Sequence, residues 1–303
     1  MSTATRHTPT PHDNRRASLA MGGAALGFAL MAALAHGMRA ELPWPVVAFA
    51  RCLAMLLVMA VLLSVRRAPL VLLGNRALWL RSLFGTLGLL TTFYCLSRMP
   101  VADTVVIFAM SPIWIAVIMA RMGHGRVTRA TWLHLALAIG GVLVMQRPSF
   151  SVDSLPLAVA VAGSVAVAAA MVSLSLTRDY PRETVVMHFS LCATLATLLL
   201  SAAVLDRLPP VPGGAPLRYA ALLAAMGCCG TAGQLLMTAA YQRGRPTLMA
   251  LVGLSQIVMG AAFDVALFGH PMDLFKGLGI LLIGLGIGLN LVQGAPPEAA
   301  PQA

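Results

Sequence analysis

Ten apolar segments, each about 20 residues long, follow one another along the chain with only short polar connections between them. About 20 apolar residues are what an α-helix needs to cross the hydrocarbon core of a bilayer. The connections are too short to form a soluble domain, so the sequence predicts an all-α protein with a single membrane domain. The expected spans are residues 18–38, 45–64, 77–97, 102–121, 130–147, 155–177, 184–204, 217–240, 246–268 and 274–293.

The composition supports this interpretation. The chain has 303 residues and is 59% hydrophobic and only 10% charged, against about 25% charged residues in soluble domains. The two ends, residues 1–17 and 294–303, are rich in proline and in small or polar residues. We expect them to be disordered tails.

The net charge of +11 is explained by membrane topology. If the N-terminus is cytoplasmic, 13 basic residues fall on the cytoplasmic side and six on the outside, while Arg51 and Arg81 lie within spans. This bias follows the positive-inside rule and predicts that both termini are cytoplasmic. Because the basic residues are explained in this way, no nucleic-acid partner is expected. The cytoplasmic set is Arg6, Arg15, Arg16, Arg66, Arg67, Arg76, Arg121, Arg126, Arg129, Arg178, Arg182, Arg243 and Arg245, and the outside set is Arg39, Arg98, Arg147, Arg207, Arg218 and Lys276.

The sequence offers little that is suited to catalysis or metal binding. All five cysteines fall within expected spans, without metal-ligand spacing and without a CxxC motif. The chain has no HExxH motif and no phosphate-binding loop, and only one acidic residue, Asp264, lies well within a span. These features argue against an intramembrane enzyme and against ATP-driven transport, and no cofactor or metal is expected.

The second half of the chain repeats features of the first. Residues 93–102 correspond to residues 237–246, because each segment ends an apolar helix, makes a tight polar turn and starts another helix. Ser111 then corresponds to Ser255, at an offset of 144 residues, and a glycine-containing apolar helix closes each half. With five spans in each half, the second half enters the bilayer from the opposite face. The sequence therefore predicts two inverted repeats, as in many secondary transporters that work by alternating access.

Together these features resemble the drug/metabolite transporter superfamily, specifically the ten-helix EamA-type permeases with two EamA repeats. The resemblance rests on the turn at residues 97–100, on Ser111-Pro112 midway along the fourth span, on Arg51 and on the glycine-rich helix that closes each repeat. It implies a bacterial inner-membrane permease with a central cavity between the repeats, often an exporter of amino acids or other small metabolites. The implied division is a tail (1–17), a first repeat (18–147), a second repeat (155–293) and a second tail (294–303).

Two positions depart from the family pattern. The family commonly has Gly-Glu after the fourth and ninth spans, where this chain has Gly123-His124 and Gly269-His270. A histidine at both places could respond to pH. A role in ending a helix or making a turn is our expectation.

Polar and aromatic side chains in the middle of spans are the candidates for substrate binding. Amide and hydroxyl groups at this depth need partners, which are either other helices or a bound solute. Pro112 either frees a backbone carbonyl that a ligand could use or simply kinks its helix. The candidate substrate-binding residues are Tyr94, Ser111, Trp114, Gln234, Ser255 and Gln256.

Ionisable residues within spans are the candidates for coupling or gating, since charge in the hydrocarbon region is costly. Arg51 and Asp264 are expected at similar depth near the outer side, where they could pair, line a vestibule or anchor helix ends. Asp264 has no acidic counterpart in the first half, which would suit proton coupling. His188 could face the cavity or hydrogen-bond a neighbouring helix, and we favour the hydrogen bond. We expect Arg81 to reach towards lipid headgroups.

The last span contains a GxxxG motif at residues 284–288. Small residues at this spacing allow close helix approach, either to the fifth span or across a dimer. We expect packing within one chain, and the sequence is compatible with a monomer or a homodimer.

The sequence thus predicts a secondary active transporter, not an enzyme, whose partners are a small-molecule substrate and the lipid bilayer, with protons as a candidate coupling ion. The expected substrate is an amino acid or a similar zwitterion, exported, with Arg51 available to its carboxylate. The alternative is an uptake carrier for a nucleoside-like metabolite such as S-adenosylmethionine. A channel and an intramembrane enzyme are further alternatives.

Overall fold

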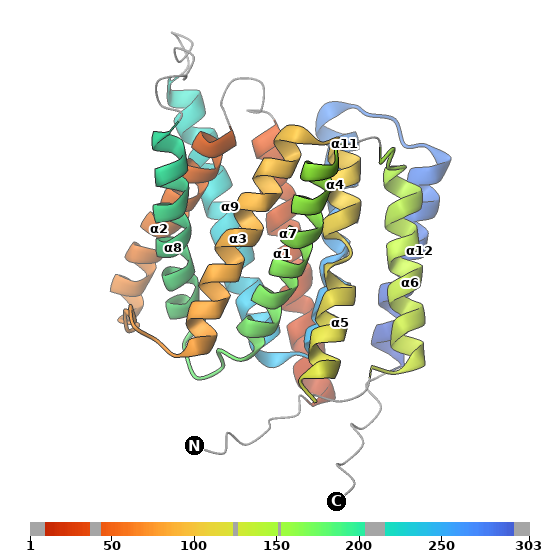
Figure 1. Ribbon diagram of the computed structural model, residues 1–303, viewed down its shortest axis with the longest axis horizontal. Coiled ribbons are helices and arrows are strands. Elements are labelled where there is room, and N and C mark those ends of the chain that lie inside the picture. The colour runs from red at the N-terminus through yellow and green to blue at the C-terminus, as the bar shows by residue number, and fades with distance from the viewer. Residues whose placement is uncertain (1–9, 37–43, 124–126, 151–152, 204–215, 294–303) are drawn as a thin grey trace, which may run out of the picture.

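The computed structural model describes residues 10–36, 44–123, 127–150, 153–203 and 216–293. Within these ranges the chain forms twelve helices and no strands (Figure 1). The helices are α1 (Pro11–His36), α2 (Trp44–Arg66), α3 (Arg76–Arg98), α4 (Val101–Phe108), α5 (Ser111–Arg121), α6 (Arg129–Gln146), α7 (Ser154–Ser175), α8 (Arg182–Ala202), α9 (Pro216–Arg243), α10 (Pro246–Gly253), α11 (Ser255–Phe268) and α12 (Leu274–Val292).

Nine helical segments among the described residues are long and apolar enough to cross a membrane, so the protein is a multi-pass all-α membrane protein, as predicted. α4 and α5 together form one of these segments, and α10 and α11 form another. α3 is not among the nine, although it is 23 residues long and extends from one edge of the bundle to the other (Figure 1). Arg81 within α3 lowers its mean hydropathy.

The first helix is longer than expected. α1 begins at Pro11, so the last part of the segment predicted to be a disordered tail is helical. The Asp13 carboxylate accepts hydrogen bonds from the backbone and hydroxyl of Thr10, and the Thr10 hydroxyl accepts one from the Asp13 backbone, which caps the helix start. Asn14 then accepts a hydrogen bond of 3.1 Å from the backbone of Arg245. These contacts fix the start of α1 to the turn between α9 and α10.

The spans expected over residues 102–121 and 246–268 are each broken near the middle. Both breaks contain a 3₁₀-type hydrogen bond. The backbone N–H groups of Met110 and Leu254 each donate to the carbonyl three residues earlier, at 3.1 Å in both cases. At the first break Pro112 has no N–H with which to continue the helical hydrogen bonds. The second break occurs without a proline, so the sequence indicated only the first.

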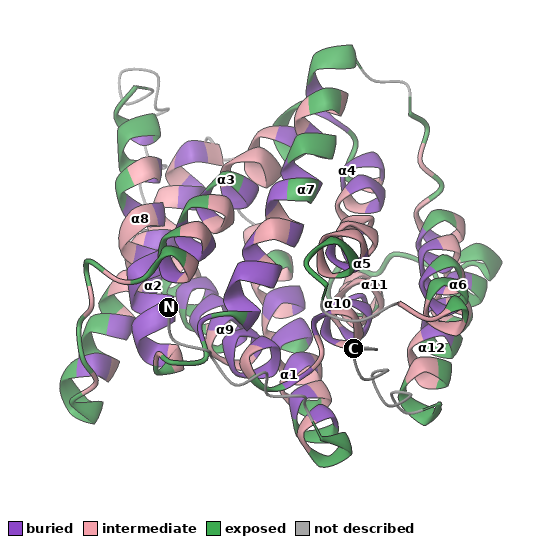
Figure 2. Cartoon of the chain, turned by 60° about the horizontal axis from the view of Figure 1, so that its bottom comes forward, coloured by how far each residue is buried: buried purple, intermediate pink, exposed green. Residues whose placement is uncertain are grey.

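Helices of the first half pack against helices of the second. α1 packs against α9, α3 against α7, α2 against α8, and α6 against α12. The α6/α12 pair stands at one side of the bundle and contacts the remaining helices through α4, α10 and α11 (Figures 1 and 2). α2, α3, α8 and α9 lie together at the other side and form a second contiguous group.

Many buried residues are alanines and methionines, and large aliphatic side chains are exposed on many of the helices. Figure 2 shows that buried and exposed residues occur along the same helices. The interface of α1 with α9 is typical, with alanines and methionines around Phe28 and Tyr241. Lipid tails are as apolar as leucine, so an outer surface of this kind is suited to a bilayer. Examples of exposed large side chains are Leu57, Val61, Leu87, Leu133, Leu199 and Leu281.

Glycines bring α6 and α12 into close contact. A Cβ atom on Gly141 would lie 2.8 Å from the carbonyl oxygen of Gly279, and one on Gly286 would lie 2.9 Å from the Cβ of Ala138. The predicted approach of the last span to the fifth is therefore confirmed. The glycines of the GxxxG motif at residues 284–288 do not make this contact, because no atom of another described helix lies within 4 Å of the Cβ position at either glycine.

Two further glycines end helices. Gly123 and Gly269 follow α5 and α11 with φ of +69° and +68°, a left-handed conformation that glycine adopts without steric cost. The turn role expected for Gly269-His270 is confirmed. His124 lies outside the described residues.

Candidate substrate site

Arg81 of α3 is a deeply buried charged residue, with only 1% of its surface exposed. Its Nη2 donates a hydrogen bond of 3.0 Å to Oε1 of Gln234 on α9, and its Cζ lies 4.3 Å from the centre of the Phe189 ring on α8. Gly85, one turn along α3, leaves room for the guanidinium, because a Cβ there would collide with Nη1. The expectation that Arg81 reaches towards lipid headgroups is wrong: the side chain is enclosed by α3, α8 and α9.

Several buried polar atoms of α2, α3 and α8 have no hydrogen-bond partner among the described residues. They include Nε and Nη1 of Arg81 itself, Nε of Arg51 on α2, and the hydroxyls of Thr86 on α3 and Thr194 on α8. Buried polar groups in proteins are nearly always hydrogen-bonded. The group formed by α2, α3, α8 and α9 therefore contains an unusual concentration of unsatisfied donors.

Arg51 belongs to the same region. Its Cζ lies 6.0 Å from the centre of the Phe93 ring on α3, and its Nε lies 3.7 Å from the Cβ position of Gly230 on α9. Gly230 and Gln234 are about one helical turn apart. Arg51 and Arg81 therefore lie beside adjacent turns of α9.

His188 joins α8 to α3 next to Arg81. Its Nδ1 lies 2.6 Å from the Ser82 hydroxyl and its Nε2 lies 3.2 Å from the carbonyl oxygen of Leu72. A carbonyl only accepts, so Nε2 donates to it and Nδ1 of the neutral ring accepts from Ser82. The Trp79 ring packs against the imidazole at right angles, with centroids 4.7 Å apart. The interpretation that His188 hydrogen-bonds a neighbouring helix is confirmed.

Two of the aromatic candidates have partners in other parts of the bundle. Trp114 of α5 donates its indole N–H to the hydroxyl of Ser164 on α7, at 3.1 Å. Tyr94 of α3 is half-buried against a cluster that includes Cys95 and Ile107. The structure therefore brings Gln234 together with Arg81, whereas it places Trp114 and Tyr94 in separate clusters.

The remaining three substrate candidates lie at the helix breaks. Ser111 is the first residue of α5, and Ser255 and Gln256 are the first two residues of α11. All three are partly buried, and the Ser255 hydroxyl is a buried group without a hydrogen-bond partner in the described part of the chain. Their shared position supports the correspondence of Ser111 with Ser255.

Asp264 does not pair with Arg51. Its carboxylate lies 2.8 Å from Nδ1 of His270 and 3.7 Å from Nζ of Lys276. Both partners follow the end of α11 in the chain. In the same region Asp273 caps α12 and forms an ion pair of 2.6 Å with Arg147 at the end of α6. The hydrogen bond from the Lys276 backbone, with the nearby Arg147 cation, holds the pKa of Asp273 below its ordinary value.

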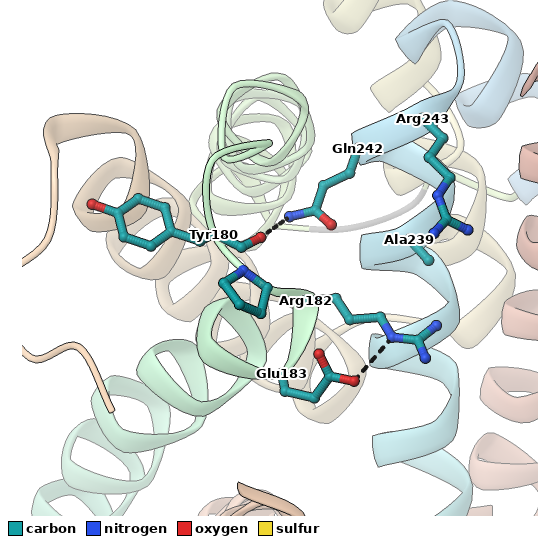
Figure 3. A pocket seen from close by; sticks show the side chains of 7 residues that line it. Tyr180, Arg182, Glu183, Ala239, Gln242 and Arg243 are labelled. Atoms are coloured by element: carbon teal, nitrogen blue, oxygen red, sulfur yellow. Dashed lines mark hydrogen bonds and ion pairs between the residues drawn. The ribbon is translucent and has the colours of Figure 1, made fainter. Parts of the chain in front are cut away.

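At the opposite edge of the bundle a polar pocket of about 280 Å³ lies between α8 and α9 (Figure 3). Glu183 accepts from Arg182 at 3.2 Å and from Arg66 of α2 at 3.0 Å. Gln242 donates to the carbonyl oxygens of Thr177 and Tyr180, at 2.9 Å and 3.1 Å. The sequence analysis did not single these residues out, although an acidic residue in the first turn of a helix with arginines nearby is a recognisable signal. The pocket is lined by Tyr180, Pro181, Arg182, Glu183, Ala239, Gln242 and Arg243.

Comparison with known proteins agrees with this architecture. The sequence model of the EamA-like transporter family matches residues 15–147 and again 154–292. The chain is 28% identical over 262 residues to the pseudopaline exporter of Pseudomonas aeruginosa, covering 86% of this chain and 90% of that protein. It is 24% identical over 215 residues to an uncharacterized transporter of Helicobacter pylori, covering 69% of this chain and 71% of that protein.

A solved crystal structure shares the fold. It is 19% identical in sequence, has a TM-score of 0.78, and the match covers 92% of this chain and 98% of that chain. The two family matches together cover most of the sequence, and the relatives named here are transporters. The protein is a transporter rather than an enzyme, and it belongs to the EamA-like transporter family.

Proposed function

We propose that this protein is a secondary active transporter that exports a small metabolite, an amino acid or similar zwitterion, by alternating access. The observation that carries the proposal is the 28% identity to the pseudopaline exporter over nearly the full length of both chains. That likeness favours export over uptake. It also favours a carrier over a channel.

The proposed architecture is ten spans in two inverted five-span repeats, residues 18–147 and 155–293, with α3 as the tenth span. The helix contacts support it. If the two halves are exchanged, the contact of α1 with α9 becomes that of α7 with α3, and the contact of α1 with α11 becomes that of α7 with α5. The pairs α2/α8 and α6/α12 map onto themselves. A two-fold relation between the halves produces this pattern.

The proposed location is the bacterial inner membrane with both ends of the chain in the cytoplasm. The start of α1 and the end of α12 lie at the same, lower edge of the bundle in Figure 1. Arg66, Arg121 and Arg243 end helices that run towards this edge. Such a bias in basic residues supports a cytoplasmic assignment for this edge.

We place the substrate between the two halves, beside Arg81, Arg51 and Gln234. The other candidates then line its path along α3, α5 and α11.

Asp264, with His270 and Lys276 beside it, is the proposed coupling group at the outer edge, and His188 is a positioning residue at the inner one. Asp264→Asn is expected to change transport or its pH dependence, and unchanged transport at several pH values would remove Asp264 from the proposal. The residues that line the proposed substrate path on α3, α5 and α11 are Tyr94, Ser111, Trp114, Ser255 and Gln256.

Counterflow in proteoliposomes tests the proposal. Vesicles loaded with unlabelled solute are diluted into labelled amino acids or labelled S-adenosylmethionine, with protein-free liposomes as control. We expect saturable exchange of at least one amino acid. Exchange of S-adenosylmethionine alone would favour the uptake alternative. Non-saturable flux without counterflow would indicate a channel, since only a carrier exchanges solute one for one.

A further inference from the structure

We propose that Arg81 binds the carboxylate of the transported solute and that Arg51 supplies a second cationic contact to it. The substrates of this protein are then carboxylates. That the bound carboxylate is also transported rests on the proposed function, whereas its binding at Arg81 rests on the contacts described above. Neither the family match nor the relatives' names assign a role to Arg81.

The Arg81 charge is buried without a counter-charge in the described part of the chain. Placing an arginine in a membrane helix is costly on insertion scales. Arg81 receives little compensation, because its partners are a neutral amide and an aromatic ring. No aspartate or glutamate among the described residues forms an ion pair with Arg81 or Arg51. Ionisable residues within spans mark substrate or ion pathways, and an anionic solute would supply the counter-charge that Arg81 lacks.

Arg81 has N–H donors that no other described residue uses. A guanidinium has five N–H groups in a planar fork that matches the two oxygens of a carboxylate. Nη2 donates to Gln234, which holds the guanidinium from one side, and the Phe189 ring packs against the guanidinium. Nε and Nη1 keep their hydrogens without an acceptor. Nε and Nη1 lie on different edges of the guanidinium, so a carboxylate would be held by one of them together with the second hydrogen of Nη2.

Arg51 and Arg81 both contact α9 near its middle. α9 has 28 residues and is about 42 Å long, so Gly230 and Gln234 lie near its middle. Arg51 approaches Gly230 from α2, and Arg81 approaches Gln234 from α3. Substrate sites of secondary transporters lie near the membrane midplane, between the repeats. The two cations therefore lie at the depth where a solute would be bound.

The unpaired atoms of Arg81 are shielded from solvent in this conformation. Access therefore requires the surrounding helices to separate. Separation on one side at a time is what alternating access provides. The polar pocket at the inner edge has a different character, since its carboxylate, Glu183, already pairs with two arginines.

The test is ligand-dependent thermal stability of the purified protein in detergent. The probes are L-amino acids with the matching L-amino acid amides, and the dicarboxylates succinate and 2-oxoglutarate. We expect carboxylates to raise the Tm and the amides, which lack the negative charge, to leave it unchanged. In Arg81→Gln the concentration for half-maximal stabilisation should rise by about 10- to 100-fold, because a charge-assisted bidentate contact is lost. If no carboxylate in the panel stabilises the wild type, the proposal is overturned.

Arg98→Gln is the matched control, since it removes the same charge from the exposed end of the same helix. It should bind carboxylates as the wild type does. If Arg81→Gln does not fold, Arg81→Lys provides the measurement, with about 10-fold weaker binding expected because lysine lacks the planar fork. Equal carboxylate binding by the wild type and either Arg81 variant would also overturn the proposal.

Counterflow with the same variants separates this inference from the proposed function. Carboxylate binding that depends on Arg81, in a protein that exchanges nothing, would contradict transport and leave the site standing. Exchange of an amino acid that is unaffected by Arg81→Gln would contradict the site and leave transport standing.

Discussion

The α6/α12 pair and the group of α2, α3, α8 and α9 achieve helix packing in different ways. Between α6 and α12, glycines bring the backbones into contact, and the polar groups at the interface have partners: Asn290 lies 3.1 Å from Nδ1 of His134, and Arg147 pairs with Asp273. In the second group, buried donors of Arg51 and Arg81 have no partners. The polar groups named at the α6/α12 interface have partners within the pair, whereas buried donors in the group of α2, α3, α8 and α9 have none among the described residues.

This difference separates stability from function within one bundle. Close glycine contacts and satisfied hydrogen bonds give a region with little to gain from rearrangement. Unsatisfied buried groups reduce stability, and proteins retain such groups where function requires them. We therefore expect mutations in the two regions to have opposite effects on stability, and the predictions below test that contrast.

The largest expected effect is that of Gly141→Val. The added Cβ would lie 2.8 Å from the carbonyl oxygen of Gly279 and 2.8 Å from the backbone nitrogen of Ile283, and backbone atoms cannot move aside as side chains can. We expect a loss of about 3 kcal/mol, seen as a lower Tm in detergent and a lower yield of monodisperse protein. Gly140→Val is the control, because no other described residue lies within 4 Å of that Cβ position. Equal losses in both variants would contradict the importance of this contact.

Arg81→Met should act in the opposite direction. Burying an ion costs several kcal/mol even after relaxation, and replacing this poorly paired charge by an apolar side chain of similar length removes that cost. We expect an unchanged or higher Tm together with loss of transport. A drop in Tm as large as that of Gly141→Val would show that Arg81 holds the fold, and the contrast between the two regions would fail.

A moderate effect is expected for the ion pair at the inner edge. The Glu183 side chain is 9% exposed and that of Arg66 is 53% exposed, so solvent screens the pair in part. A double-mutant cycle with Glu183→Gln and Arg66→Gln should give a coupling energy of about 0.5–1 kcal/mol, measured by thermal or denaturant unfolding. Strictly additive effects would mean that the pair does not join α2 to α8.

The smallest expected effect concerns pH at the outer edge. The pKa of Asp273 is lower in the folded protein than its ordinary value, so the carboxylate contributes stability at pH values above the ordinary pKa. That contribution is lost as the pH falls through the folded pKa. The Tm difference between the wild type and Asp273→Asn should be constant near neutral pH and should shrink below about pH 4. A difference that persists unchanged at about pH 3 would contradict the role of the ionised carboxylate.

The sequence was sufficient for the features that depend on local pattern. Hydrophobic length predicted nine candidate spans among the described residues, whereas the expected span at α3 is not among them. The offset between Ser111 and Ser255 marked the first residues of α5 and α11, although not that both spans are broken. Gly269 was expected at a helix end because of its local context, and it has the positive φ that such a position favours.

Features that depend on helix rotation could not be predicted in this way. Arg81 lies near one end of its span, a position from which an arginine can reach either lipid headgroups or the interior. The choice depends on Phe189 and Gln234, more than 100 residues away in the chain. Asp264 was matched to Arg51 by depth alone, whereas its observed partners include His270, only six residues away.

The broken spans have a mechanical consequence. α4 and α10 are both eight residues long, so each is a rigid rod of about 12 Å attached at a pivot. A tilt of about 10° at such a pivot moves the far end of the rod by about 2 Å. With the proposed orientation α4 occupies the outer leaflet and α10 the inner one. Each leaflet therefore contains one short lever that can swing while the longer half of its span stays in place.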